Sequence, residues 1–260
     1  MTAATDTHGP LLIGFLFNAT FYGECTMLVQ SYFYFKLFRT DKLWTRILVI
    51  VIILLDTLNT VFDFAYLYGS LINHFGPPDD DSYLAKATWL FATDPILTGL
   101  IACLGQLFYA WRVKALTGNI WLTLVVVACS LIGLAGGVAT TIEVLLTPIY
   151  ANFIHFKGTV IIWLGAECLA DIFITAILVL HLSSHKSGLE ASDVLVDRII
   201  RMTMQTGLAT VVCAVVDLVL FLAHPGGLHL AFNIPLCKLY TNSLLSSLNA
   251  RNPQGGGFRE

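Results

Sequence analysis

Carboxyl groups lie inside apolar stretches of this sequence, where a charged side chain is costly. Asp56, Asn59, Thr60 and Asp63 follow one another at spacings of three, one and three residues, so they share one face of a helix. A carboxylate at bilayer depth costs roughly 2.5 to 3.5 kcal/mol on insertion scales. We therefore expect the face that carries these residues to point toward protein or water and away from lipid.

Further acids occur in the other apolar stretches, and one base accompanies them. The base is Lys238, and the acids are Glu24, Asp56, Asp63, Asp94, Glu143, Glu167, Asp171 and Asp217. This many carboxylates cannot all be ionised around one ammonium in a low-dielectric interior, so several are expected to be protonated, hydrogen-bonded or hydrated. Glu167 and Asp171 are four residues apart, so we expect them to share a proton or to bracket a cation.

We predict that eight of these polar residues form an intramembrane core that binds a small ligand. They are Asp56, Asn59, Asp63, Asp94, Glu167, Asp171, Asp217 and Lys238. Lys238 follows Pro235, which kinks a helix. Two roles are open for this lysine: a salt bridge to Asp63, Asp94 or Asp171, or a Schiff base as in retinal proteins. The cysteines lack metal-binding spacings such as C-x-x-C, so we expect neither a metal site nor a cofactor.

The composition defines the elements that must position these side chains. The chain has 260 residues, of which 57% are hydrophobic and 12% charged, with a mean hydropathy of +0.77. Soluble domains carry about 25% charged residues. We therefore expect an integral membrane protein with the lipid bilayer as its partner, and the absence of a basic patch argues against nucleic-acid binding.

Seven stretches are long and apolar enough to span a bilayer, which predicts an all-α, seven-transmembrane helix bundle. They are residues 11–35, 47–72, 84–110, 120–146, 160–182, 199–223 and 228–248. The expected organisation is a short extracellular segment at 1–10, a seven-helix domain at 11–250 and a disordered cytosolic tail at 251–260. Gly133 and Gly137 form a G-x-x-x-G pattern that serves helix packing inside the bundle or dimerisation.

The distribution of Lys and Arg predicts the orientation of the bundle. Eleven of these residues lie in or beside the first, third and fifth expected connections or in the tail: Lys36, Arg39, Lys42, Arg46, Arg112, Lys114, Lys186, Arg198, Arg201, Arg251 and Arg259. Only Lys86 and Lys157 lie on the opposite side. By the positive-inside rule the amino terminus is outside and the carboxyl terminus is cytosolic. We expect the plasma membrane rather than an internal membrane.

Several sequence blocks are similar to a known family. They are Gly9-Pro10-Leu11-Leu12-Ile13-Gly14, the stripe from Asp56 to Asp63, Ser70-Leu71-Ile72-Asn73-His74-Phe75-Gly76, Ala110-Trp111-Arg112-Val113, and Lys238-Leu239-Tyr240-Thr241-Asn242-Ser243-Leu244-Leu245 with Leu248-Asn249-Ala250-Arg251. These blocks resemble the large basidiomycete family of multi-spanning proteins that carry a domain of unknown function. The resemblance implies a fungal seven-helix membrane protein without an established activity, and it transfers no catalytic residue.

Three functions fit these observations. The first is a receptor or sensor that binds a small apolar or amphipathic ligand among the eight core residues and acts on a cytosolic signalling partner. The second is a membrane-embedded enzyme in which Asp63, Asp94 or Asp217 protonates a terpenoid-like substrate. The third is a proton-linked transporter, which requires the acids to form a path through the bundle. We expect a binding protein rather than an enzyme.

Overall fold

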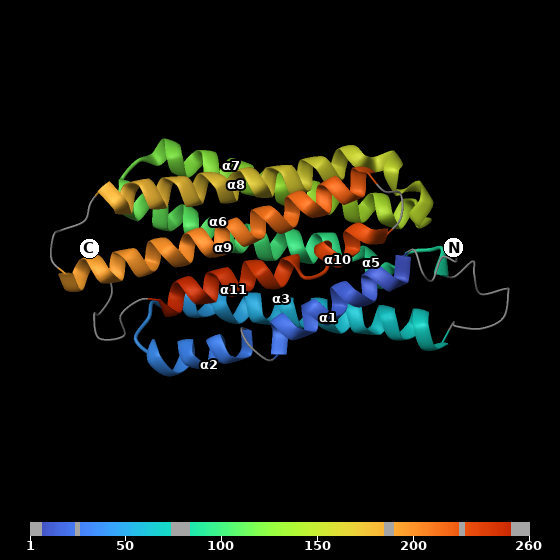
Figure 1. The fold of residues 1–260 in the computed structure, drawn as a ribbon, viewed down its shortest axis with the longest axis horizontal. Coiled ribbons are helices and arrows are strands. Elements are labelled where there is room, and N and C mark those ends of the chain that lie inside the picture. The colour runs from blue at the N-terminus through green and yellow to red at the C-terminus, as the bar shows by residue number, and fades with distance from the viewer. Residues whose placement is uncertain (1–6, 24–26, 74–83, 185–189, 224–226, 251–260) are drawn as a thin grey trace.

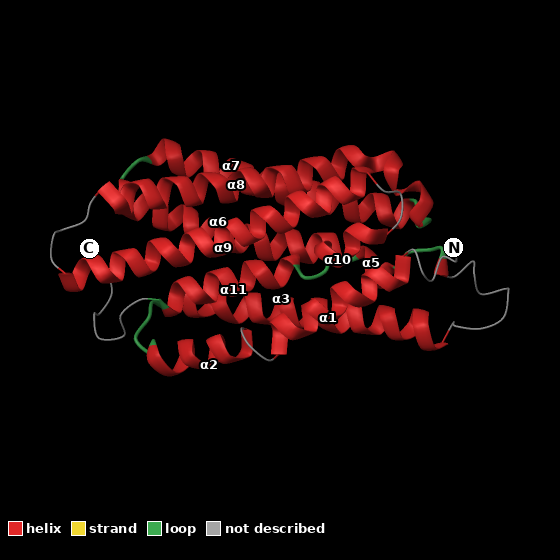
Figure 2. Ribbon diagram, viewed as in Figure 1, coloured by secondary structure: helices red, strands yellow, loops and turns green. Residues whose placement is uncertain are grey.

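The fold is a bundle of helices that run along one long axis (Figures 1 and 2). The computed structural model describes residues 7–23, 27–73, 84–184, 190–223 and 227–250, and no strand is assigned within them. Helix α1 begins at one end of the bundle and α11 ends at the other (Figure 1). Residues 1–6 and 251–260, which include most of the expected outer segment and the whole expected tail, lie outside the described residues.

Six helical segments of the described chain are long and apolar enough to cross a membrane. They are formed by α1 (Gly9–Gly23) with α2 (Met27–Leu37), by α3 (Leu43–Tyr68) with η2 (Gly69–Asn73), by α5 (Trp89–Ala92) with α6 (Asp94–Thr117), by α7 (Ile120–Leu146), by η3 (Tyr150–Phe156) with α8 (Lys157–Ser184), and by α9 (Glu190–Ala223). This arrangement makes the chain an integral, multi-pass membrane protein.

The last predicted span, 228–248, is not one continuous helix. It consists of η4 (Gly227–His229), α10 (Leu230–Asn233) and α11 (Leu236–Asn249), with a break at Ile234 and Pro235. Proline has no backbone N–H and its ring clashes with the preceding turn, so it ends α10. The polar residues of α11 also lower its hydropathy, yet α11 is largely buried and packs against α9, α2 and α6. This segment therefore passes through the bundle as two short helices.

The first predicted span, residues 11–35, lies within one helical segment, Gly9–Leu37, that is long and apolar enough to cross a membrane. Helices α1 and α2 form this segment, and residues 24–26 between them are outside the described residues. Glu24, one of the acids singled out above, lies outside the described residues. Glu143, another of those acids, is half-buried near the end of α7 and apart from the polar core.

Glycines on α7 allow it to pack closely against α6 and α8. A Cβ atom at Gly136 would lie 2.7 Å from the backbone of Trp163, and one at Gly137 would lie 2.8 Å from the carbonyl oxygen of Pro95. A Cβ at Gly133 would lie 2.9 Å from the side chain of Glu167. The G-x-x-x-G pattern therefore packs inside the bundle, and the face it lies on is covered by neighbouring helices of the same chain.

The start of the described chain is packed into the end of the bundle. His8 is buried, its ring contacts Tyr66 and Tyr150 edge-on, and neither ring nitrogen has a hydrogen-bond partner among the described residues. Burial lowers the pKa of His8, because a charged imidazole is poorly solvated there. The folded protein therefore favours the neutral form of His8 more strongly than the unfolded chain does.

Acidification is expected to destabilise the protein through His8. The folded state binds fewer protons than the unfolded state at this site, so its contribution to stability is complete above the usual histidine pKa of about 6.5 and is lost as the pH falls below it. Thermal unfolding of wild type and the His8→Gln variant between about pH 5 and pH 8 measures this contribution. His155→Gln, at an exposed histidine, is the matched control. An unchanged pH dependence in His8→Gln would contradict the prediction.

Candidate functional site

The centre of the bundle holds a buried ion pair between α3 and α11. The Nζ of Lys238 lies 2.6 Å from Oδ1 of Asp56 and donates to the backbone oxygen of Asp56 at 2.8 Å. Both side chains are fully buried. The expected partners of this lysine were Asp63, Asp94 or Asp171, and that expectation was wrong: α11 packs so that Lys238 meets Asp56, about two helical turns before Asp63 on α3.

Asn59 connects this ion pair to a second acid. Its Oδ1 accepts from the Nζ of Lys238 at 3.1 Å, whereas its Nδ2 donates to Oδ1 of Asp94 at 2.9 Å. An amide is suited to this position, because its carbonyl end faces the cation and its N–H end faces the carboxyl group. Asn59 therefore joins α3, α6 and α11 in one polar network.

Asn18 on α1 completes this network, although the sequence analysis did not select it. Its Nδ2 lies 3.1 Å from Oδ2 of Asp63 and 3.0 Å from the carbonyl oxygen of Ile234. The carbonyl of Ile234 lacks a helical N–H partner because the helix breaks at Pro235, so Asn18 satisfies it. The signal in the sequence was an amide in the middle of an apolar helix, which is costly unless it is hydrogen-bonded.

Glu167 and Asp171 on α8 have separate partners. Glu167 accepts from the indole Nε1 of Trp163 at 2.8 Å and from the hydroxyl of Tyr240 at 3.4 Å. Asp171 accepts from Gln106 and from Thr210, as described below. No hydrogen bond joins the two carboxyl groups in the described structure, so they do not share a proton as expected.

Asp217 on α9 faces a cavity near the end of the bundle where α1 begins. Its Oδ2 accepts from Nδ2 of Asn233 at 2.8 Å, whereas its buried Oδ1 has no hydrogen-bond partner among the described residues. We call this space the outer cavity. Its volume is about 40 Å³, which is room for a few water molecules. Asp94 and Asp217 provide its acids, and aromatic rings of Phe91, Phe153, Phe156, Trp163 and Phe221 provide much of its wall.

A second cavity lies on the other side of Glu167, beside Asp171. We call it the inner cavity, and its volume is about 20 Å³. All eight predicted core residues are buried, but they do not line one common chamber. Asp94 and Asp217 line the outer cavity and Asp171 lines the inner one, whereas Asp56, Asn59, Asp63, Glu167 and Lys238 line neither. The expected single acidic pocket is therefore two small cavities joined by a hydrogen-bonded core.

The fold and these polar groups define an all-helical integral membrane protein with a hydrogen-bonded acidic interior. A comparison with known protein families matches residues 167–253 to the Family of unknown function (DUF6534). The match covers about a third of the chain and includes Glu167, Asp171, Asp217 and Lys238, and it supports the domain of unknown function expected from the sequence. No curated protein and no solved structure matches the chain.

Proposed function

We propose that this chain is a seven-helix membrane protein, with its amino terminus outside, that binds a small positively charged ligand in the outer cavity and acts as a sensor of it. Eleven Lys and Arg residues lie in the connections and tail that are expected at the end opposite to the amino terminus, and this distribution supports the orientation. The observation that carries the ligand-binding proposal is the buried Oδ1 of Asp217, which has no hydrogen-bond partner in the described chain and lies at the cavity.

The acids of the outer cavity favour a cationic ligand. Asp94 and Asp217 take part in no ion pair within the described residues. The buried Lys238 does not neutralise them, because it is paired with Asp56. An uncompensated carboxylate is costly in a low-dielectric interior. A bound ammonium-type cation would supply the missing charge and would donate a hydrogen bond to the free Oδ1 of Asp217.

The walls of the outer cavity favour an ammonium-type group. Phe91, Phe153, Phe156 and Trp163 are buried around the two acids. The faces of such rings attract a cation by about 0.5 to 2 kcal/mol each, depending on desolvation. Rings and carboxylates together suit an amine or a small alkylammonium ion better than Mg²⁺ or Ca²⁺, which prefer oxygen ligands.

The size of the cavity limits the ligand. A volume of about 40 Å³ lies well below the roughly 300 to 1,000 Å³ of sites for drug-sized molecules. A terpenoid-like substrate does not fit this space, so the geometry does not support the enzyme alternative. Ammonium and methylammonium are of suitable size.

Methylammonium is expected to raise the melting temperature of the purified protein, because a ligand that binds only the folded state stabilises it. The titration uses a constant sodium chloride background, and methanol serves as the neutral ligand of similar size. Asp217→Asn is expected to weaken methylammonium binding roughly 10- to 100-fold, the range for losing a charge-assisted hydrogen bond.

Asp171→Asn is the matched control for this experiment, because Asp171 is a buried acid of the other cavity. It is expected to keep the response to methylammonium. Equal responses in wild type and Asp217→Asn, or no response in wild type, would overturn the proposal.

A further inference from the structure

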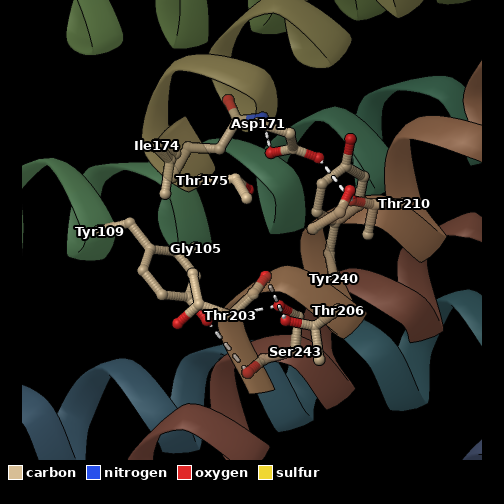
Figure 3. A pocket seen from close by; sticks show the side chains of 12 residues that line it. Gly105, Tyr109, Asp171, Ile174, Thr175, Thr203, Thr206, Thr210, Tyr240 and Ser243 are labelled. Carbon is tan, nitrogen blue, oxygen red and sulfur yellow. Dashed lines mark hydrogen bonds between the residues drawn. The ribbon is translucent and has the colours of Figure 1, made fainter. Parts of the chain in front are cut away.

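The inner cavity has a different lining from the outer one. It lies between α6, α8, α9 and α11, and Figure 3 shows Asp171 and Thr210 at one side of it and Tyr109 and Ser243 at another. Its oxygen-bearing walls include Asp171, Thr203, Thr206, Thr210, Tyr240 and Ser243. Its volume of about 20 Å³ is close to the space of one water molecule. This lining suits a small hydrophilic occupant.

The carboxyl group of Asp171 has hydrogen-bond donors but no countercharge. Its Oδ1 accepts from Nε2 of Gln106 at 2.9 Å, and its Oδ2 accepts from Oγ1 of Thr210 at 2.7 Å. No Lys or Arg side chain of the described residues forms an ion pair with it. Neutral donors compensate only part of a buried negative charge, so an ionised Asp171 requires a cation nearby.

The hydroxyl of Thr210 links the charge of Asp171 to the backbone. Its oxygen lies 2.7 Å from Oδ2 of Asp171 and 3.0 Å from the carbonyl oxygen of Gly207. A threonine hydroxyl has one proton, so it donates to one of these acceptors at a time. When Thr210 donates to Asp171, the carboxyl group is free to be ionised and the lone pairs of the hydroxyl are available to a cation.

The kind of cation follows from the lining and the size of the inner cavity. Carboxylate and hydroxyl oxygens are hard ligands, which suit alkali and alkaline-earth ions better than soft metals. Mg²⁺ dehydrates reluctantly and usually keeps several waters, for which a space of about one water molecule has no room. A single carboxylate also balances one positive charge rather than two. These constraints select a small monovalent ion.

We propose that the inner cavity is a binding site for one Na⁺-sized monovalent cation, held by Asp171 and Thr210 together with further oxygen atoms of the cavity lining. This site is distinct from the outer cavity and does not depend on the function proposed for it. It would replace the missing countercharge of Asp171 and tie α8, α9 and α11 together.

Sodium chloride is expected to raise the melting temperature of the purified protein more than potassium chloride or N-methylglucamine chloride at the same ionic strength, and the effect is expected to saturate. Asp171→Asn is expected to weaken the response to Na⁺ at least about tenfold, because Asp171 is the charged side chain among the described residues that line the inner cavity. Asp217→Asn, at the outer cavity, is expected to keep the full response to Na⁺.

A second variant and a direct measurement keep the test decisive if Asp171→Asn folds poorly. Thr206→Val removes one hydroxyl of the cavity and is expected to reduce the preference for Na⁺ over K⁺. Wild-type protein is expected to bind radioactive ²²Na⁺ in competition with unlabelled Na⁺ but not with N-methylglucamine. Identical melting temperatures in the three salts, or no competed ²²Na⁺ binding, would overturn the proposal and leave the outer-cavity proposal untouched.

Discussion

The Lys238→Met variant is expected to lose about 3 to 5 kcal/mol of stability, the usual cost of removing one partner from a buried ion pair. The reason is that Asp56 would keep a fully buried carboxylate with no cation beside it. Asn59 would also lose one of the hydrogen-bond donors to its Oδ1, the ammonium group of Lys238. The measurement is the melting temperature, or the denaturant midpoint, of the purified protein in detergent.

The double variant Lys238→Met/Asp56→Asn is expected to recover most of this loss, because it removes both charges. Lys157→Met is the matched control, since it makes the same chemical change at an exposed lysine. Its effect is expected to stay within about 0.5 kcal/mol, as is usual for surface substitutions. If Lys238→Met were as stable as Lys157→Met, the ion pair would not hold the bundle together.

The Gly136→Leu variant is expected to force α7 and α8 apart. Even the Cβ atom would lie 2.7 Å from the backbone N and Cα of Trp163, and backbone atoms cannot rotate away as a side chain can. Overpacking of a closely packed interior costs typically about 1 to 3 kcal/mol. Because Trp163 also lines the outer cavity, the variant is expected to reduce methylammonium binding together with the melting temperature.

Gly165→Ala on α8 is the matched control for this prediction. A Cβ atom there would have no heavy atom within 4 Å outside its own stretch of helix. Alanine is favoured over glycine in a helix by about 1 kcal/mol, so this variant is expected to be as stable as wild type or slightly more stable. A Gly136→Leu protein with wild-type stability would show that the two helices tolerate a wider separation.

The sequence predicts the helical class and the inward face of α3 well. Both rest on local rules: an apolar stretch of bilayer length forms a helix, and an acid within it turns away from lipid. Asp56, Asn59 and Asp63 are accordingly buried. The partner of Lys238 could not be predicted in this way, because α3 and α11 are far apart in the sequence and their relative register depends on packing.

The division of the polar core into two cavities could not be predicted from the sequence either. Periodicity shows that Glu167 and Asp171 share a face, but it does not show that Trp163 and Tyr240 reach the first while Gln106 and Thr210 reach the second. These partners are neutral, so a count of charged residues does not identify them. Amides and indoles within apolar helices are the sequence signal for such partners, because buried polar groups are hydrogen-bonded.

The break at Ile234 and Pro235 divides the last helical segment into the short helices α10 and α11. Helix α11 is anchored to α3 by Lys238, whereas α10 contacts Asp217 through Asn233. A ligand bound between Asp217 and Asp94 would therefore displace α10 first, by tilting it about the break, while α11 stays in place. The break would thus allow α10 to move while the Lys238–Asp56 ion pair keeps α11 in place.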